Sequence, residues 1–467
     1  MVPAGVDARE RDLREVVLHG VHRCATGRVF LDEALRREFA RTGFPARLRG
    51  AAARTASGII RRRGTLDHLI GCFSDLPLRK IDPLLLDVLR LAVYEILFVR
   101  ETPVHASVDE AVKLTKRLVR EEFAGFTNAL LRNLIRSVEK KRATAGLSSR
   151  AFSARELPTA PGHVVRFNRD LFPDPQADLC GYLSTAGGMP RWLVERWQRN
   201  FGTDVVFQIV EASNAQPPLS IRVNTLKTTA EELSAELARA DVRTAPGGVE
   251  HSLIVQSPVE LTTLDAFRTG GFYIQDTSAM VAPRQLMPRA GERVLDLCAA
   301  PGGKTTHLAE LSGDRAELFA LDVSPRRLAL VEQNARRLGI TCVRTAVGDA
   351  RRIDDDMKGT FDAVLADVPC SNTGVLRRRV EARHRLRPET IERLKEVQTD
   401  ILRTALAAAR PGGRVVYSTC SIEPEEDDKV VGRVLAEHPN WRLDAAEKVL
   451  PRADGPDGGY AARLVCR

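Results

Sequence analysis

The chain has 467 residues, more than one ordinary domain holds, so we expect about two or three domains. Hydrophobic residues make up 43% and charged residues 28%, a balance that excludes a disordered chain and favours a globular one. The formal net charge of +9 favours an anionic partner, and arginine outnumbers lysine, which suits phosphate and base contacts. A GC-rich genome would also inflate arginine and alanine, so charge alone does not identify nucleic acid.

Cysteine usage and hydropathy exclude several classes of protein. The eight cysteines contain no CxxC pair, which argues against a zinc site and a disulfide framework. No run of about 18 apolar residues is present, and the amino terminus is charged rather than signal-like. We therefore expect a cytoplasmic protein with reduced thiols, no metal and no membrane segment.

The first 140 residues carry apolar side chains at helical spacing, with Gly and Pro between the helices. The clearest predicted helix covers residues 81–99, where Pro83 suits the first turn. A later helix is predicted behind Ser107 as the N-cap, with Glu110 three residues on, and another covers residues 125–138. The region is predicted to be an all-α domain, residues 1–142.

Periodicity fails over residues 143–180, which we interpret as a linker long enough to hold a short helix or strand. Helical spacing returns at 189–202, and one face of that helix is predicted to be core rather than a base-stacking platform. That face carries Trp192, Leu193, Trp197 and Phe201. Strand and helix patterns then predict a small α+β domain over residues 181–270.

Strands alternate with helices of about 10–15 residues beyond residue 271, which predicts a doubly wound, Rossmann-like α/β domain over residues 271–467. The predicted strands are RVLDLC, LFALD, CVRTAV, FDAVLADV and RVVYST. Helices are predicted to begin near Thr305, Pro325, Pro388 and Glu425. The terminal DGGYAARLVCR is predicted to be a closing antiparallel strand.

The loop DLCAAPGGKT follows the first of these strands and has the features of a nucleoside-cofactor loop. Glycines let the backbone approach a ligand, and the following helix N-terminus favours an anion. The GxGxxG and GxxxxGK[ST] spacings are absent, and Pro301 argues against an ordinary pyrophosphate loop, whereas the carboxylate of S-adenosylmethionine fits.

Acidic residues follow the next two strands. Asp322 lies 19 residues after Gly303, a separation at which a carboxylate meets ribose hydroxyls, and Asp349 can accept from an adenine amino group. The predicted cofactor-binding residues are Cys298, Ala299, Ala300, Pro301, Gly302, Gly303, Lys304, Asp322, Asp349 and Asp367. Among these, Cys298 is predicted mainly to pack at the loop entrance.

Two later loops, ADVPCSNTG and YSTCS, place Cys370 and Cys420 at the carboxyl ends of predicted strands, where open α/β sheets bind ligands. A thiolate that adds to carbon 6 of cytosine makes carbon 5 nucleophilic enough to take a methyl group. Two cysteines can divide attack and release. Asp367 can contact the pyrimidine edge, and Lys304 can act by its charge.

The segments LRLAVYEILF, VHASVDEAVKLTKRL and FTNALLRNLIR resemble the NusB-type antitermination domain over about residues 8–142. That module binds RNA, so the resemblance makes Arg61, Arg62 and Arg63 candidate RNA contacts. The alternative is a solvated turn.

CAAPGGKT with PCSNTG and STCS closely resembles RNA 5-methylcytosine methyltransferases of the RsmB (Sun/Fmu) branch, which joins a NusB-like domain to a class I S-adenosylmethionine-dependent fold. The resemblance implies that Cys420 attacks and Cys370 assists release, although DNA cytosine methyltransferases use the earlier cysteine. It also implies a cytosine of 16S rRNA as substrate. Protein-free rRNA is favoured, because the base must leave its stack.

Further RNA contacts are predicted from this resemblance and from charge. Arg222 and Asn224 lie in the segment PxxxRVNxLK. A basic run follows the PCS loop, with a solvated face as the alternative: Arg377, Arg378, Arg379, Arg383, Arg385 and Arg387. Departures from the family pattern at Val380, Glu381, His384 and Asp427 put the fine substrate contacts in doubt.

Two alternative functions stay open. One is the same reaction on tRNA, and the other is a non-catalytic rRNA-binding assembly factor. We expect a monomer.

Overall fold

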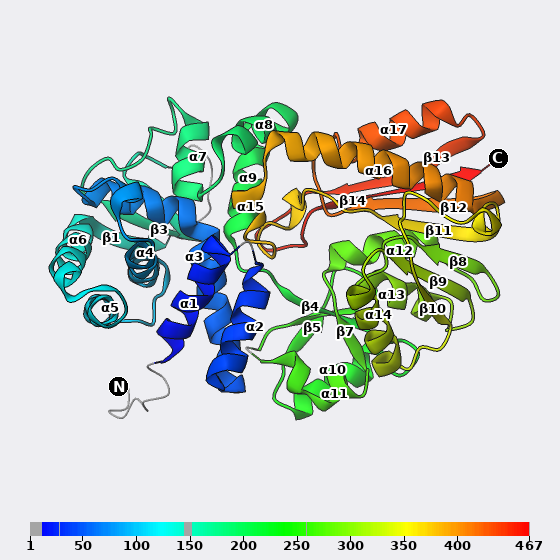
Figure 1. Cartoon of the computed structure of the whole chain (residues 1–467), viewed down its shortest axis with the longest axis horizontal. Coiled ribbons are helices and arrows are strands. Elements are labelled where there is room, and N and C mark those ends of the chain that lie inside the picture. Colours follow the sequence, from blue (N-terminus) through cyan, green and yellow to red (C-terminus); the bar gives the residue numbers. More distant parts are fainter. Residues whose placement is uncertain (1–11, 28, 144–151, 258, 467) are drawn as a thin grey trace. The chain divides into compact units, whose positions relative to one another are not determined.

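The computed structural model describes residues 12–27, 29–143, 152–257 and 259–466 (Figure 1). The chain forms two compact units, Met1–Gln216 and Pro217–Arg467. Among the described residues, no helix combines the length and apolarity needed to cross a bilayer.

The amino-terminal part of the first unit is helical, as predicted. Its helices are α1 Asp12–Thr26, α2 Leu31–Thr42, α3 Ala46–Phe73, α4 Pro83–Phe98, α5 Val104–Leu114 and α6 Ala124–Ser137. Helix α4 begins at Pro83 because the Asp82 carboxylate accepts from the backbone amides of Leu84 and Leu85. Helix α5 corrects the predicted N-cap: it begins at Val104, and Ser107 is buried inside it.

The segment predicted as a linker contains two strands. Strands β1 Val138–Ala143, β2 Glu156–Ala160 and β3 His163–Phe167 form an antiparallel sheet in the order β1-β3-β2. Helices α7 Leu179–Gly187, α8 Arg191–Phe201 and α9 Thr203–Asn214 follow. On α8, Leu193 and Trp197 are fully buried, so both are core residues as predicted.

Helices α7 to α9 belong to the first unit, although the predicted middle domain began at residue 181. Helix α7 packs against α3, and Thr65 Oγ1 donates to the Ala186 carbonyl at 3.0 Å. The division therefore follows packing, whereas the predicted boundaries follow the loss and return of helical periodicity.

The second unit begins with an α+β module. Its sheet has the order β5-β6-β4-β7, from β4 Leu219–Val223, β5 Thr244–Pro246, β6 Ser252–Val255 and β7 Phe272–Ile274. Helix α10 Ala230–Arg239 starts with a capping box between Thr229 and Glu232, and the short α11 Asp265–Arg268 precedes β7.

A seven-stranded sheet forms the remainder of this unit, in the order β10-β9-β8-β11-β12-β14-β13. The strands are β8 Arg293–Asp296, β9 Glu317–Asp322, β10 Val343–Val347, β11 Phe361–Asp367, β12 Ala409–Thr419, β13 Trp441–Val449 and β14 Gly459–Cys466. The first five are mutually parallel, and β14 is antiparallel to both of its neighbours, as predicted.

Helices cover both faces of this sheet (Figure 1). They are α12 Val281–Leu286, α13 Gly303–Leu311, α14 Pro325–Leu338, α16 Pro388–Ala408 and α17 Asp428–Glu437, and the short α15 Ala382–Arg385 precedes α16 in the chain. One core joins the sheet to α16 and α17 and the other joins it to α12, α13 and α14. Both predicted proline starts, Pro325 and Pro388, are observed. The doubly wound architecture thus leaves the carboxyl edge of the parallel strands for ligands.

Candidate active site

The two cysteines of the PCS and TCS loops meet at the carboxyl edge of the sheet. Asp367 on β11 pairs in parallel register with Ser418 on β12, so the loops that follow start side by side. The Sγ atoms of Cys370 and Cys420 lie 3.0 Å apart, and both are free cysteines. Cys420 also donates to Asn372 Oδ1 at 3.2 Å.

The Cys370 thiol is held in its neutral form. Its hydrogen bond with Cys420, its burial and the nearby charge of Glu426 raise the pKa of the Cys370 thiol well above its usual range. A neutral Cys370 can therefore donate a hydrogen bond to the sulfur of Cys420.

Glu426 ties the two cysteine loops together behind the sulfur atoms. Its carboxylate is fully buried and accepts from the Ser371 amide at 2.9 Å, from the Ser371 hydroxyl, and from Ser421 Oγ at 2.5 Å. Gln398 Nε2 donates to it at 2.9 Å. Burial raises the pKa of Glu426. Sequence reasoning missed this residue, and its signal was a carboxylate close behind the TCS loop.

Lys304 and Asp367 form an ion pair beside the thiols, with Nζ and Oδ2 2.7 Å apart. The other Asp367 oxygen accepts from Ser418 Oγ at 2.8 Å. Burial lowers the pKa of Lys304, but the charge and hydrogen bond of Asp367 outweigh burial, so the net pKa is raised. Lys304 therefore remains a cation.

A cavity of about 250 Å³, which we call the thiol chamber, lies next to this ion pair. Cys420, Lys304, Asn372 and Ser418 are among the residues that line it. Cys370 is not among the described lining residues. A molecule in the thiol chamber can therefore meet the sulfur of Cys420.

The CAAPGGKT loop packs its backbone closely against α14. Gly302 has a φ of +103°, and a Cβ there would lie 3.1 Å from the Val331 Cα, so any other residue would be strained and crowded against α14. Ala299 and Ala300 are buried, Pro301 is exposed, and Gly303 begins α13. The loop thus offers backbone and a helix N-terminus rather than side chains.

Carboxylates surround this loop. Asp322 is buried and accepts from the Ala300 amide at 3.2 Å and the Ser324 amide at 3.0 Å. Asp349 lies beyond the end of the neighbouring strand, where hydrogen bonds from Arg351 lower its pKa.

Asp296, which sequence reasoning missed, is buried beneath the loop. Thr305 Oγ1 donates to its Oδ2 at 2.7 Å, while Oδ1 has no hydrogen-bond partner among the described residues. Burial raises the pKa of Asp296 to about 7. Cys298 is half-buried against the core, as its predicted packing role requires, and burial raises its pKa well above the usual range. The unpartnered Asp296 oxygen lies beneath the loop that contains Gly302, and this arrangement fits a small polar ligand.

Known proteins share this organisation. Residues 283–464 match the family model of the 16S rRNA methyltransferase RsmB/F, residues 11–136 match the NusB family, and residues 189–262 match the ferredoxin-like domain of RsmF/B-like methyltransferases. Ribosomal RNA small subunit methyltransferase B of Vibrio cholerae serotype O1 is 32% identical over 416 residues, which cover 87% of each chain. The probable ribosomal RNA small subunit methyltransferase B of Bacillus subtilis is 30% identical over 410 residues, 87% of this chain and 85% of that one.

The chain belongs to the RsmB/F family of 16S rRNA methyltransferases. It is an S-adenosylmethionine-dependent rRNA methyltransferase with an RNA substrate, so the predicted family, NusB-like domain and cofactor are confirmed. The crystal structure of PH0851 matches it with a TM-score of 0.75 and 26% identity over 97% of this chain and 98% of that one. Among the described residues of this RsmB/F member, no group of three His, Cys, Asp or Glu side chains could hold a metal ion.

Two of the residues predicted to contact RNA are interior residues. Arg222 is fully buried, and its Nε and Nη2 each donate to a Glu310 oxygen at 2.8 Å. Asn224 is also buried and donates to the carbonyls of Gly270 at 2.8 Å and Leu338 at 2.9 Å. These contacts hold β4 to α13 and α14, so the prediction that they touch RNA is corrected.

The basic run beyond the PCS loop contains both buried and exposed arginines. Arg377 is fully buried and bonded to Asp457, which corrects its predicted RNA contact. Arg378 bridges Asp457 and Asp276. Arg379 is exposed and lines the thiol chamber, so it remains the arginine of this triplet best placed for a phosphate.

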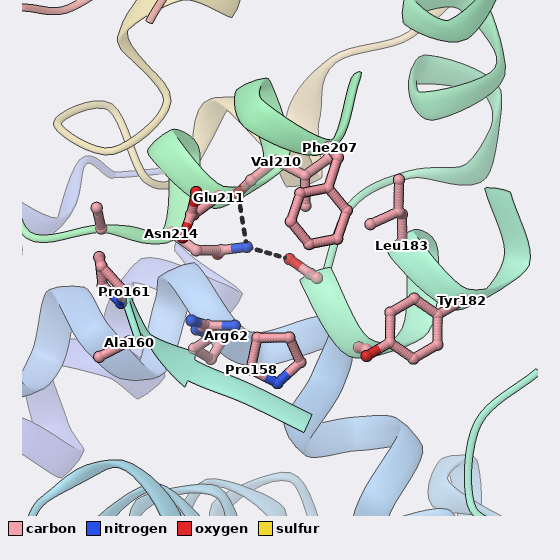
Figure 2. Close-up of a pocket in the computed structure, with 13 residues that line it drawn as sticks. Arg62, Pro158, Ala160, Pro161, Tyr182, Leu183, Phe207, Val210, Glu211 and Asn214 are labelled. Carbon is pink, nitrogen blue, oxygen red and sulfur yellow. Dashed lines mark hydrogen bonds between the residues drawn. The ribbon is translucent and has the colours of Figure 1, made fainter. Parts of the chain in front are cut away.

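The arginine triplet of the NusB-like domain lies on α3 rather than in a turn. Arg61 and Arg62 are buried, while Arg63 is half-buried. Figure 2 shows the guanidinium of Arg62 inside a pocket beside Pro158. Burial and then repulsion from Arg61 lower the pKa of Arg62 to about 10. These positions do not suit the predicted surface contact for Arg61 and Arg62.

Proposed function

We propose that this enzyme transfers a methyl group from S-adenosylmethionine to carbon 5 of a cytosine in 16S rRNA, through a covalent bond between Cys420 and carbon 6. One observation carries the choice of nucleophile. Cys420 lines the thiol chamber beside the Lys304 cation, whereas Cys370 is outside its described lining and has a raised pKa.

The chemistry starts when the Cys420 thiol, which donates to Asn372 Oδ1, loses its proton to solvent. The thiolate then adds to carbon 6 and moves an electron pair toward carbon 5. Both Asp367 oxygens already accept hydrogen bonds, one from Lys304 and one from Ser418. Asp367 therefore holds Lys304 in place, and the Lys304 cation stabilises the negative charge that develops on the ring. S-adenosylmethionine, when bound, supplies the methyl group.

For release, a solvent base takes the proton from carbon 5. The electron pair of that C–H bond restores the ring double bond, and the bond to Cys420 breaks with its electron pair on sulfur. The departing sulfur lies 3.0 Å from Cys370. A neutral Cys370 thiol donates a hydrogen bond to that sulfur and stabilises it as a leaving group. Cys370 thus assists release without itself attacking.

The CAAPGGKT loop and the carboxylates after β9 and β10 are our candidates for holding the cofactor. Gly302 would let the backbone approach the ligand, the start of α13 would receive its carboxylate, and Asp322 and Asp349 would accept from its ribose and adenine. The glycine cradle and the orphaned Asp296 oxygen support this fit.

The proposed substrate is protein-free 16S rRNA, and the names of the curated relatives support an rRNA substrate. A base that must leave its stack costs a few kcal/mol to extrude, which favours unpaired RNA before ribosomal proteins cover it. The same reaction on tRNA is the alternative.

The experiment is methyl transfer from labelled S-adenosylmethionine to three RNAs, with bisulfite sequencing to locate the product. Protein-free 16S rRNA is expected to gain one 5-methylcytosine, and assembled small subunits and tRNA are expected to gain little. Label that appears only in tRNA, or at an atom other than carbon 5, would contradict the proposal.

A further inference from the structure

A second cavity adjoins the thiol chamber on the side of the four-stranded sheet. It measures about 510 Å³, and we call it the side chamber. Five residues line both cavities: Asp276, Ser278, Val281, Glu447 and Val449. A nucleotide chain that reaches Cys420 can therefore place an adjoining group in the side chamber.

The walls of the side chamber are largely apolar. Pro218 and Ile254 contribute from the α+β module, and Val281, Val449 and Pro456 contribute from the methyltransferase domain. Apolar walls with a few polar groups are the usual lining of a site for a small planar ligand. A nucleobase meets this description, and a ribose phosphate does not.

The ionisable side chains in this lining are all acidic. Asp276, Glu447 and Asp454 line the side chamber, and no described lysine or arginine does. Arg378 pairs with Asp276. Glu447 is exposed, and its carboxylate makes no hydrogen bond or ion pair with any described residue. Asp454 also has a cation near it, Arg452 at 3.7 Å. The lining therefore holds no described cation for a phosphate, and Glu447 offers a free acceptor to an amino group.

The thiol chamber has a mixed lining, in which three cations stand beside the carboxylates of Asp276, Glu447 and Asp457. Lys304, Arg378 and Arg379 line it, and cations of this kind attract the phosphates that flank a bound nucleotide. The described cations line the thiol chamber and not the side chamber, so we expect the phosphates of a bound strand beside the thiol chamber and an apolar base in the side chamber.

We propose that the side chamber binds the base of a nucleotide next to the target cytosine and that Glu447 accepts a hydrogen bond from the exocyclic amino group of that base, an assignment that rests on the methyl transfer proposed above. Adenine, cytosine and guanine carry such a group, and uracil does not. A divalent cation is the other species that carboxylates attract, but the described residues contain no cluster fit to hold one. The enzyme thus selects an amino-bearing neighbour.

The test uses full-length 16S rRNA transcripts in which each neighbour of the methylated cytosine is changed in turn to all four bases. Wild type is compared with Glu447→Gln and with Asp444→Asn. Asp444 lies on the same strand, pairs with Arg463 and lines neither chamber, so it controls for lost charge.

At one of the two positions, the kcat/KM of wild type is expected to be roughly tenfold higher with an amino-bearing base than with uracil. Glu447→Gln is expected to bring this ratio close to one, because an amide also donates to uracil, and Asp444→Asn is expected to preserve it.

Equal rates for all bases at both positions in wild type would overturn the assignment, and so would an unchanged ratio in Glu447→Gln. The thermal unfolding of wild type and of Glu447→Gln is compared, and the two midpoints are expected to agree. Failure of wild type to methylate the unaltered transcript counts instead against the proposed function.

Discussion

Glu426 accepts two hydrogen bonds from Ser371, one from the backbone amide at 2.9 Å and one from the hydroxyl. The same carboxylate accepts from Ser421. Because these serines directly follow Cys370 and Cys420, one buried side chain fixes the separation of the two sulfur atoms.

Replacing Glu426 with Gln is therefore expected to lower kcat for methylation by about 100-fold and stability by about 1–3 kcal/mol. The amide places a donor where the two serine hydroxyls need an acceptor. Titration calorimetry is expected to show an S-adenosylmethionine affinity within about twofold of wild type. Glu425→Gln, at the neighbouring half-buried carboxylate that pairs with Lys429, is the control. A wild-type kcat in Glu426→Gln would show that the serine contacts do not position the thiols.

Arg222→Met is expected to destabilise the second unit by about 3–5 kcal/mol, because it leaves Glu310 charged, buried and unpaired. Arg379→Met is the comparison, since this exposed arginine is expected to leave thermal stability unchanged and to weaken RNA binding with a shallower salt dependence. Thermal unfolding and filter binding at several salt concentrations measure both effects. Loss of RNA affinity in a stably folded Arg222→Met protein would restore the contact predicted from the sequence.

Asp427 is expected to make stability depend on pH. Burial raises its pKa to about 8, although Lys448 opposes the shift, whereas an unfolded aspartate titrates near about 3.9. Between these values the folded chain keeps a proton that the unfolded chain has released. Stability therefore falls as pH rises through this window, by up to about 1.4 kcal/mol per pH unit.

Asp427→Asn is expected to remove this contribution and to be the more stable protein at pH 8. Urea unfolding at pH 5 and pH 8 measures the difference, with the exposed neighbour Asp428→Asn as the control. Identical pH dependence in wild type and Asp427→Asn would refute the assignment.

Gly302→Ala is expected to weaken S-adenosylmethionine binding about tenfold, because the new Cβ lies 3.1 Å from the Val331 Cα and forces the loop away from α14. Gly412→Ala is a matched control, since Gly412 also has a positive φ of +72° but has no atom within 4 Å of the added Cβ. Equal cofactor affinity in the two variants would mean that close approach at Gly302 is not needed.

The meeting of Cys370 and Cys420 at one edge could be predicted, because loops that follow parallel strands emerge on the same side of a sheet. The burial of Arg222 could not be predicted from the sequence. Its partner Glu310 lies 88 residues away on α13, and a strand with alternating polarity indicates an outward side chain unless such a partner is known. Glu426 was missed for the same reason, since its contacts join segments that are separated by 55 residues.

The start of α5 shows a local limit. Ser107 and Glu110 have the spacing of a capping box, but the helix begins at Val104, directly after Pro103. Pro103 therefore decides where this helix begins, and Ser107 does not act as its N-cap. Charge was misleading in a similar way for Arg62 and Arg377, because neither burial nor a distant partner is visible in composition.

The most direct test of the central claim is the identity of the cysteine that bonds to RNA. Cys370→Ala and Cys420→Ala are each incubated with 16S rRNA and S-adenosylmethionine, and any protein–RNA species is resolved by denaturing gel and mapped by mass spectrometry. Cys370→Ala is expected to accumulate an adduct at Cys420, and Cys420→Ala is expected to form neither adduct nor product. An adduct at Cys370 in the Cys420→Ala protein would contradict the account.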